Sequence, residues 1–181
     1  MANEPQTILD SCVLINLAAS EEIAEIVNAI DGATFICTAA QREALFLRDE
    51  ADPSMLVPLS VDDLVAVAGI RISDIATAQD EEHFVRLASD LDDGEAMSIA
   101  IADSRRMRFA SDDQKARRVF LELGHAPDRL TCTSAIVRRW AETRSIPSQQ
   151  LKATLRRIGA RARFTPSRRD PHVDWWQRAA A

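Results

Sequence analysis

The sequence predicts an α/β fold with a mainly parallel central sheet, and three observations support this class. Short apolar runs recur along the chain, and several of them end in a residue that favours the start of a helix. A helical pattern then follows, which is typical of parallel strands joined by helical crossovers. With 181 residues, of which 46% are hydrophobic, the chain is large enough to bury a substantial core.

Five apolar segments are the candidate strands, because each is short and bounded by polar residues. They are residues 7–10, 34–38, 69–75, 108–111 and 129–133. Helices are expected after Thr38, Ser111 and Thr133, where a hydroxyl residue precedes a helical pattern. A glutamine lies three residues after the first two of these, as in a capping box. Further helical stretches are expected over residues 20–30, 60–68 and 78–106.

Two proline-containing segments interrupt the pattern of strands and helices. Residues 49–59 are interpreted as an irregular connection, and residues 144–150 as a boundary. We therefore expect one domain over residues 1–145 and a basic helical extension over residues 146–181.

The C-terminal part of the chain carries most of the excess basic charge. Residues 138–181 hold 11 basic and 3 acidic residues, whereas the preceding residues hold 11 and 25. This asymmetry indicates either an anionic partner, with Arg156 and Arg157 guiding RNA, or contact between the basic part and the acidic body. Trp175 and Trp176 either stack on bases or anchor the tail in an apolar groove supplied by a partner protein or a second subunit.

Several classes of protein are disfavoured by the composition. No apolar run approaches the ~18 residues of a membrane helix, and the N-terminus lacks the parts of a secretory signal. The three scattered cysteines, without C-x-x-C, indicate reduced thiols, and the three isolated histidines show no zinc-type cluster. We therefore expect a cytoplasmic protein without a membrane partner.

Two candidate site residues lie in the first part of the chain. Asp10 closes the first strand, between two segments that the chain is expected to bury. Because burial of a lone carboxylate is unfavourable, Asp10 either caps a helix or binds a cation. Glu43 shares a face of the expected helix with Ala39 and Phe46. A surface ion pair with a neighbouring arginine is the alternative role of Glu43.

The other candidate acids lie at expected helix starts. Glu95 follows Asp92 by three residues, which resembles a capping box, and Asp112 and Asp113 suit a first helical turn. If the strands that precede Asp10 and Asp112 are neighbours, all these carboxylates converge at one edge of the sheet. Clustered carboxylates without His or Cys select Mg²⁺ or Mn²⁺, ions that support phosphoryl chemistry.

Four segments resemble, in order, the motifs of the PIN-domain family of ribonucleases. They are "ILDSCVLINL", "QREAL", "LDDGEAMSIAIA" and "FASDDQKARRVFLELG", all within residues 7–140. The third is similar to a subgroup in which a Gly-Glu-Ala triplet carries the acid. The resemblance implies a three-layer α/β/α sandwich, metal-dependent endoribonuclease activity on RNA, and a homodimer. Many bacterial members are virulence-associated protein C (VapC) toxins, so an antitoxin is a further expected partner.

The resemblance also implies a role for each site residue. The catalytic, metal-binding acids are Asp10, Glu43, Glu95 and Asp113, with Asp112 as the alternative fourth acid. Ser11 and Ser111 correspond to polar supports near the metal or the phosphate, with helix capping as the alternative. The chain departs from the family where Glu replaces the common Asp of the third motif and where Ala116 replaces a common Phe. The extension also exceeds a minimal toxin.

The residues and the resemblance together predict a metal-dependent endoribonuclease, with a toxin of a toxin–antitoxin pair as one form of it. The rival hypothesis is a non-catalytic module that keeps the fold and binds RNA or a partner through the basic tail. A phosphatase of the haloacid-dehalogenase type is disfavoured because Cys12 stands where a second Asp is expected. A dinucleotide-binding enzyme is disfavoured because no G-x-G-x-x-G occurs.

Overall fold

A five-stranded parallel sheet forms the centre of the computed structural model, which describes residues 5–181. The strands, in the order in which they pair, are β5 (Arg71–Ser73), β2 (Ala33–Cys37), β1 (Gln6–Leu9), β6 (Arg108–Ala110) and β7 (Leu130–Thr131). Every pair in this sheet is parallel. The predicted α/β class and the five predicted strands are therefore confirmed. The strands that precede Asp10 and Asp112 are neighbours, with Leu9 opposite Ala110.

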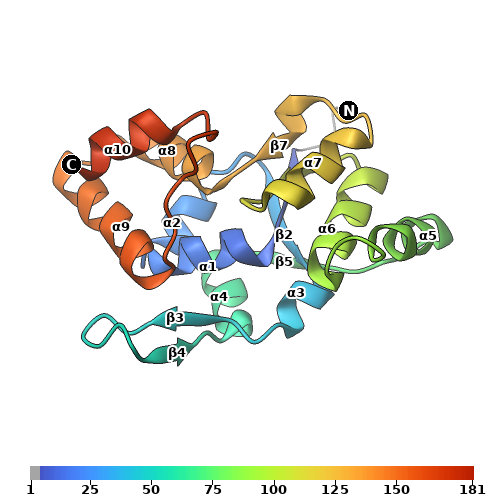
Figure 1. The fold of residues 1–181 in the computed structure, drawn as a ribbon, viewed down its shortest axis with the longest axis horizontal. Helices are drawn as coiled ribbons and strands as arrows, with labels where there is room; N and C mark the ends of the chain where they lie inside the picture. The colour runs from blue at the N-terminus through green and yellow to red at the C-terminus, as the bar shows by residue number, and fades with distance from the viewer. Residues whose placement is uncertain (1–4) are drawn as a thin grey trace.

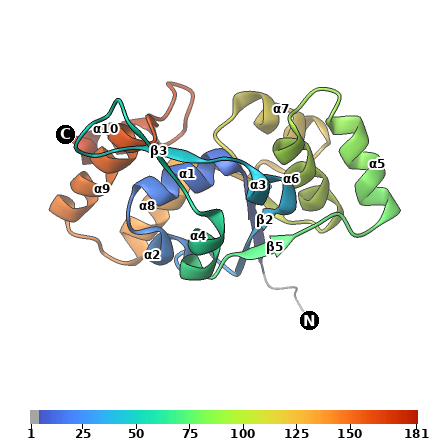
Figure 2. The same cartoon turned by 90° about the horizontal axis from the view of Figure 1, so that it is seen from below.

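Helices cover both faces of the sheet, which gives three layers (Figures 1 and 2). One group comprises α1 (Ser11–Ala19), α2 (Ile23–Val27), α4 (Val61–Ala68), α8 (Thr133–Thr143), α9 (Ser148–Arg161) and α10 (Val173–Ala180). The other comprises α3 (Thr38–Arg42), α5 (Ala78–Leu87), α6 (Asp93–Ser104) and α7 (Gln114–Glu122), and a short 3₁₀ turn, Pro127–Arg129, precedes β7.

Alternation along the strands divides the apolar side chains into two cores. Leu9 and Ala110 pack into the core beneath α1 and α8, whereas Ile8 and Phe109 pack into the core beneath α6 and α7. Successive strand residues point to opposite faces, so strands buried on both faces are apolar at nearly every position. This explains why the strand segments appear in the sequence as continuous apolar runs.

A β-hairpin follows α3, and here the predictions of a long helix after Thr38 and of an irregular connection were wrong. Strands β3 (Phe46–Arg48) and β4 (Leu56–Pro58) pair antiparallel. The helix ends at Arg42 because Glu43 adopts extended dihedrals, φ −68° and ψ 141°. Leu47 is buried and Phe46 is 45% exposed, so the short apolar run follows the period of a strand.

The predicted capping boxes at Thr38 and Ser111 are also absent from the structure. Cys37 caps α3 by accepting a hydrogen bond from Ala40 N–H, and Asp113 caps α7. The two hydroxyls bond elsewhere, since Thr38 donates to Asp74 and Ser111 to Asp10.

Two further helix boundaries differ from the predictions. Thr133 lies inside the first turn of α8, where its backbone N–H donates to Asp112 rather than its hydroxyl capping the helix. The predicted stretch 78–106 is divided into α5 and α6, with Asp92 capping the second helix through Glu95 N–H.

The C-terminal helices α9 and α10 pack onto α1 and α8 and share their core. Leu155, Ile158 and Trp176 are all at most 4% exposed within the core that also contains Leu9. The chain itself therefore supplies the apolar groove in which Trp176 lies. Among residues 5–181, no helix combines the length and apolarity needed to cross a membrane.

Candidate metal centre and nucleic-acid site

Asp10 lies at the carboxyl end of β1, where the strand meets α1. Its side chain is 2% exposed and occupies the N-cap position of α1 without accepting a capping hydrogen bond. Instead, Cys12 Sγ and Ser111 Oγ donate to Oδ2 over 3.1 and 2.8 Å. Burial raises the pKa of Asp10, although these two hydrogen bonds partly offset the effect. The carboxylate is thus oriented from two chain segments, which a simple helix cap does not require.

Glu43 approaches the same place from the end of α3. Ser11 Oγ lies 3.5 Å from Asp10 Oδ1, and the same side chain acts to lower the pKa of Glu43, so Ser11 lies close to both acids. Burial, Asp92 and Asp10 raise the pKa of Glu43. A Cβ at position 94 would lie 2.2 Å from Glu43 Oε1, so this approach requires glycine at that position.

Glu95 projects from the first turn of α6 toward the same acids. Burial raises its pKa to about 7, and the charges of Asp92, Asp10 and Asp113 add to the effect. Asp92 itself caps α6 by accepting from Glu95 N–H at 2.8 Å, which confirms its predicted capping role. A cavity of about 680 Å³ opens between α3 and α6, and Glu43 and Asp92 line it.

The structure separates the roles of the two acids that follow β6. Asp112 is held by Thr133, whose N–H donates to Oδ1 at 3.0 Å, and by Asn16, which donates to Oδ2 at 2.9 Å. Asp113 is exposed and uses only Oδ1 to cap α7, through Lys115 N–H and Ala116 N–H. The other oxygen of Asp113 is free of hydrogen bonds within residues 5–181. This geometry favours Asp113 as the acid available to a cation.

The carboxylates have no basic partner in the part of the chain that the structure describes. No Lys, Arg or His of residues 5–181 forms an ion pair with Asp10, Glu43, Glu95 or Asp113. As placed, no three Asp, Glu, His or Cys side chains of these residues form a group tight enough to hold a metal ion. The structure thus shows neighbouring, mutually repelling acids rather than a closed coordination shell.

The predicted RNA-contacting arginines lie on α9, apart from these acids in the chain. Arg156 is exposed, whereas Arg157 approaches Glu21 Oε2 to 3.4 Å and donates to the Ser20 carbonyl. Arg161 forms a second ion pair with Glu21, at 2.7 Å. At least part of the basic C-terminal charge therefore contacts the acidic body.

A protein-family model described as a PIN domain matches residues 6–168, which is most of the chain. The chain belongs to the PIN-domain family. PIN domains are generally nucleases that use divalent metal ions. No curated protein and no solved structure matches this PIN domain significantly. The match begins at β1 and ends in the segment between α9 and α10, so it covers all the candidate acids.

Sequence reasoning missed three residues that shape the site of this PIN domain. Cys12 orients Asp10, Asn16 holds Asp112, and Gly94 leaves space for Glu43. Asn16 carried a signal, because a polar residue on the otherwise apolar face of α1 needs a hydrogen-bonding partner. Gly94 was visible only as part of the Gly-Glu-Ala triplet, and its closeness to Glu43 is made across the fold. Cys12 carried no signal, because an apolar run does not show which way a thiol points.

Proposed function

We propose that this PIN domain is a divalent-metal-dependent endoribonuclease that hydrolyses RNA phosphodiester bonds. The observation that carries the proposal is a set of neighbouring carboxylates without a basic partner among residues 5–181. Burial raises the pKa of Glu95 within this set, and the charges of Asp92, Asp10 and Asp113 raise it further. Acids placed this close without cations destabilise one another when ionised. A bound divalent cation would supply the missing positive charge.

The donor set fits Mg²⁺ or Mn²⁺. Every candidate ligand is a carboxylate oxygen, and these hard donors favour hard cations. Asp10, Glu43, Glu95 and Asp113 would hold the ion. When bound, such an ion lowers the pKa of an attacking water and stabilises charge on the phosphate.

The remaining residues of the site act on the acids themselves. Ser111 and Cys12 orient the Asp10 carboxylate, and Ser11 lies close to both Asp10 and Glu43. Asp112 fixes the start of α7 by binding Thr133 and Asn16, so it supports Asp113 rather than replacing it. That Arg156 and Arg157 contact RNA stays a prediction.

The test replaces Asp10 with asparagine, which keeps the shape of the side chain and removes its charge. Purified wild type and Asp10→Asn are incubated with single-stranded RNA and Mn²⁺, with and without EDTA, and Glu82→Gln on the exposed face of α5 is the control. We expect cleavage by wild type and control, and a loss of at least about a hundredfold in the variant. Equal cleavage by the Asp10→Asn variant would refute the catalytic role.

A binding measurement separates the nuclease from the non-catalytic module. Titration calorimetry of the metal-free protein with Mn²⁺ should show saturable binding that weakens in Asp10→Asn and Glu95→Gln. A module without a metal site would bind RNA but show no saturable Mn²⁺ binding.

A further inference from the structure

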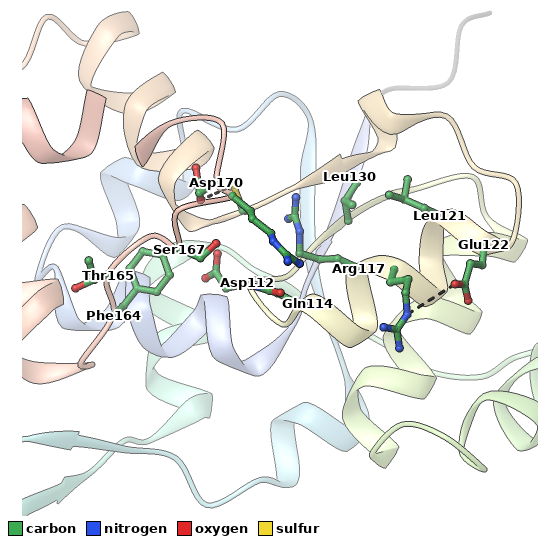
Figure 3. Close-up of a pocket in the computed structure, with 13 residues that line it drawn as sticks. Asp112, Gln114, Arg117, Leu121, Glu122, Leu130, Phe164, Thr165, Ser167 and Asp170 are labelled. Atoms are coloured by element: carbon green, nitrogen blue, oxygen red, sulfur yellow. Dashed lines mark hydrogen bonds and ion pairs between the residues drawn. The ribbon is translucent and has the colours of Figure 1, made fainter. Parts of the chain in front are cut away.

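A second cavity, of about 630 Å³, lies beside the acids, between α7, β7 and the loop over residues 164–170. Figure 3 shows Phe164, Thr165 and Ser167 of the loop on one side, and Leu121 and Leu130 farther along the cavity. Asp112 and Gln114 also line the cavity, and they flank Asp113 in the chain. The cavity therefore adjoins the segment that carries Asp113.

The walls of the cavity are apolar and partly aromatic. Leu121, Leu130 and Phe164 line them, and Leu121 is 38% exposed. The Phe164 ring packs edge-on against Trp176, with 5.4 Å between ring centroids, so its position is fixed by the core. A fixed aromatic ring at one end of the cavity and apolar side chains farther along it suit nucleobases, because every base has a flat face that stacks.

The polar side chains that line the cavity fall into two groups, those that already form hydrogen bonds within the protein and those that form none. The carboxylate of Asp170 accepts hydrogen bonds from Ser134 Oγ and His172 N–H, and that of Asp112 is bound as described above. By contrast, within residues 5–181 the side chains of Gln114, Thr165 and Ser167 form no hydrogen bond. These three side chains offer donors and acceptors to the edge of a base.

Basic side chains at the cavity complement a phosphate. Among the described residues, the Arg169 side chain forms no ion pair or hydrogen bond, and Arg118 has only a 3.7 Å contact with exposed Glu122. Arg117 donates to the carbonyls of Ser111 and Thr131, both at 2.8 Å, and so fixes this wall to the end of β6. Arginine side chains beside an apolar slot are a combination that binds single-stranded nucleic acid.

We propose that this cavity binds a short stretch of single-stranded RNA, with bases at its two ends against Phe164 and Leu121 and the phosphates at Arg118 and Arg169. The proposal rests on the proposed nuclease function, because the bound RNA places a neighbouring phosphodiester at the acids. The C-terminal loop then contributes directly to substrate binding. A peptide segment of a protein partner is the rival occupant, and its chemistry does not require an arginine without a partner, such as Arg169, at the cavity.

The test measures RNA binding separately from cleavage. Fluorescence anisotropy of a 5′-labelled single-stranded RNA is recorded in EDTA, which prevents metal-dependent hydrolysis. Leu121→Trp fills the slot without changing the charge, and Arg169→Glu reverses a charge at the cavity. The matched control is Arg86→Glu on α5, which makes the same charge change at an exposed residue outside the cavity. Circular dichroism confirms that each variant is folded.

We expect both cavity variants to weaken RNA binding about tenfold or more, as loss of one stacked base does. The control should change the affinity by less than about twofold. If Leu121→Trp does not fold, the exposed Arg169→Glu variant alone decides the question. Wild-type RNA affinity in the folded cavity variants would overturn the proposal and leave a peptide as the occupant.

The cleavage assay distinguishes this proposal from the nuclease proposal. If Asp10→Asn stops cleavage while the cavity variants bind RNA normally, only the nucleotide site is refuted. If no variant or wild type cleaves RNA while the cavity variants lose affinity, the nucleotide site stands and the nuclease assignment fails.

Discussion

The crowding of acids around Glu95 predicts that the metal-free protein is less stable than a variant without this charge. The pKa of Glu95 is raised to about 7, compared with 4.5 for a free glutamate side chain. A difference of one pKa unit corresponds to about 1.4 kcal/mol. Because Glu95 is only half-buried and solvent screens its neighbours, we expect about 1–2 kcal/mol of destabilisation above neutral pH.

The direction of the pH dependence follows from the raised pKa. Between about pH 4.5 and 7 the folded state holds a proton on Glu95 that the unfolded state has lost, so stability falls as the pH rises. Glu95→Gln cannot ionise and avoids this loss. In EDTA, its free energy of unfolding should match that of wild type near pH 4.5 and exceed it by about 1–2 kcal/mol at pH 8.

Urea unfolding at the two pH values, followed by circular dichroism, measures this difference. The melting temperature of the variant at pH 8 should rise by about 3–6 °C. Glu82→Gln, an exposed change of the same chemistry on α5, should shift neither value. Addition of Mn²⁺ should stabilise wild type more than Glu95→Gln, because a cation stabilises the folded state that binds it and the variant lacks one of the proposed ligands. A variant no more stable than wild type at pH 8 would refute the raised pKa of Glu95 and, with it, the burial of this side chain among other acids.

Three further predictions concern the space beside Glu43, the different roles of Asp112 and Asp113, and the packing of Trp176. Gly94→Ala should lower Mn²⁺-dependent cleavage at least about tenfold, because the added Cβ displaces the Glu43 carboxylate. The same change should leave the stability of α6 unchanged or raise it by about 0.5–1 kcal/mol. The control is Gly159→Ala, whose Cβ would lie 3.7 Å from its nearest neighbour and should leave cleavage unchanged. In thermal melts, Asp112→Asn should be more destabilising than Asp113→Asn, but Asp113→Asn should weaken Mn²⁺ binding more in calorimetry. Trp176→Ala should lower the free energy of urea unfolding by about 3–5 kcal/mol, and a loss below about 1 kcal/mol would show that the C-terminal helices do not belong to the folded core.

Much of the architecture could be predicted because it depends on local patterns. The strand segments are apolar on both faces and end at polar residues, and α4 and α7 follow from periodicity and acidic starts. The hairpin was missed because a three-residue apolar run fits a helix and a strand equally well. Cap residues were misassigned at Thr38 and Ser111 because a hydroxyl can instead bond to a side chain from another segment.

The sequence alone placed Asp10 and Asp112 at the ends of strand segments, because the end of an apolar run is a local property of the chain. Only the tertiary structure decided that Ser111, 101 residues away, orients Asp10, and that Asp113 rather than Asp112 keeps a free oxygen. Strand order, β5-β2-β1-β6-β7, brings these residues together. The pairing of the strands depends on burying apolar side chains on both faces of the sheet at once. Residues far apart in the chain contribute to both cores, so no short segment of sequence determines the strand order.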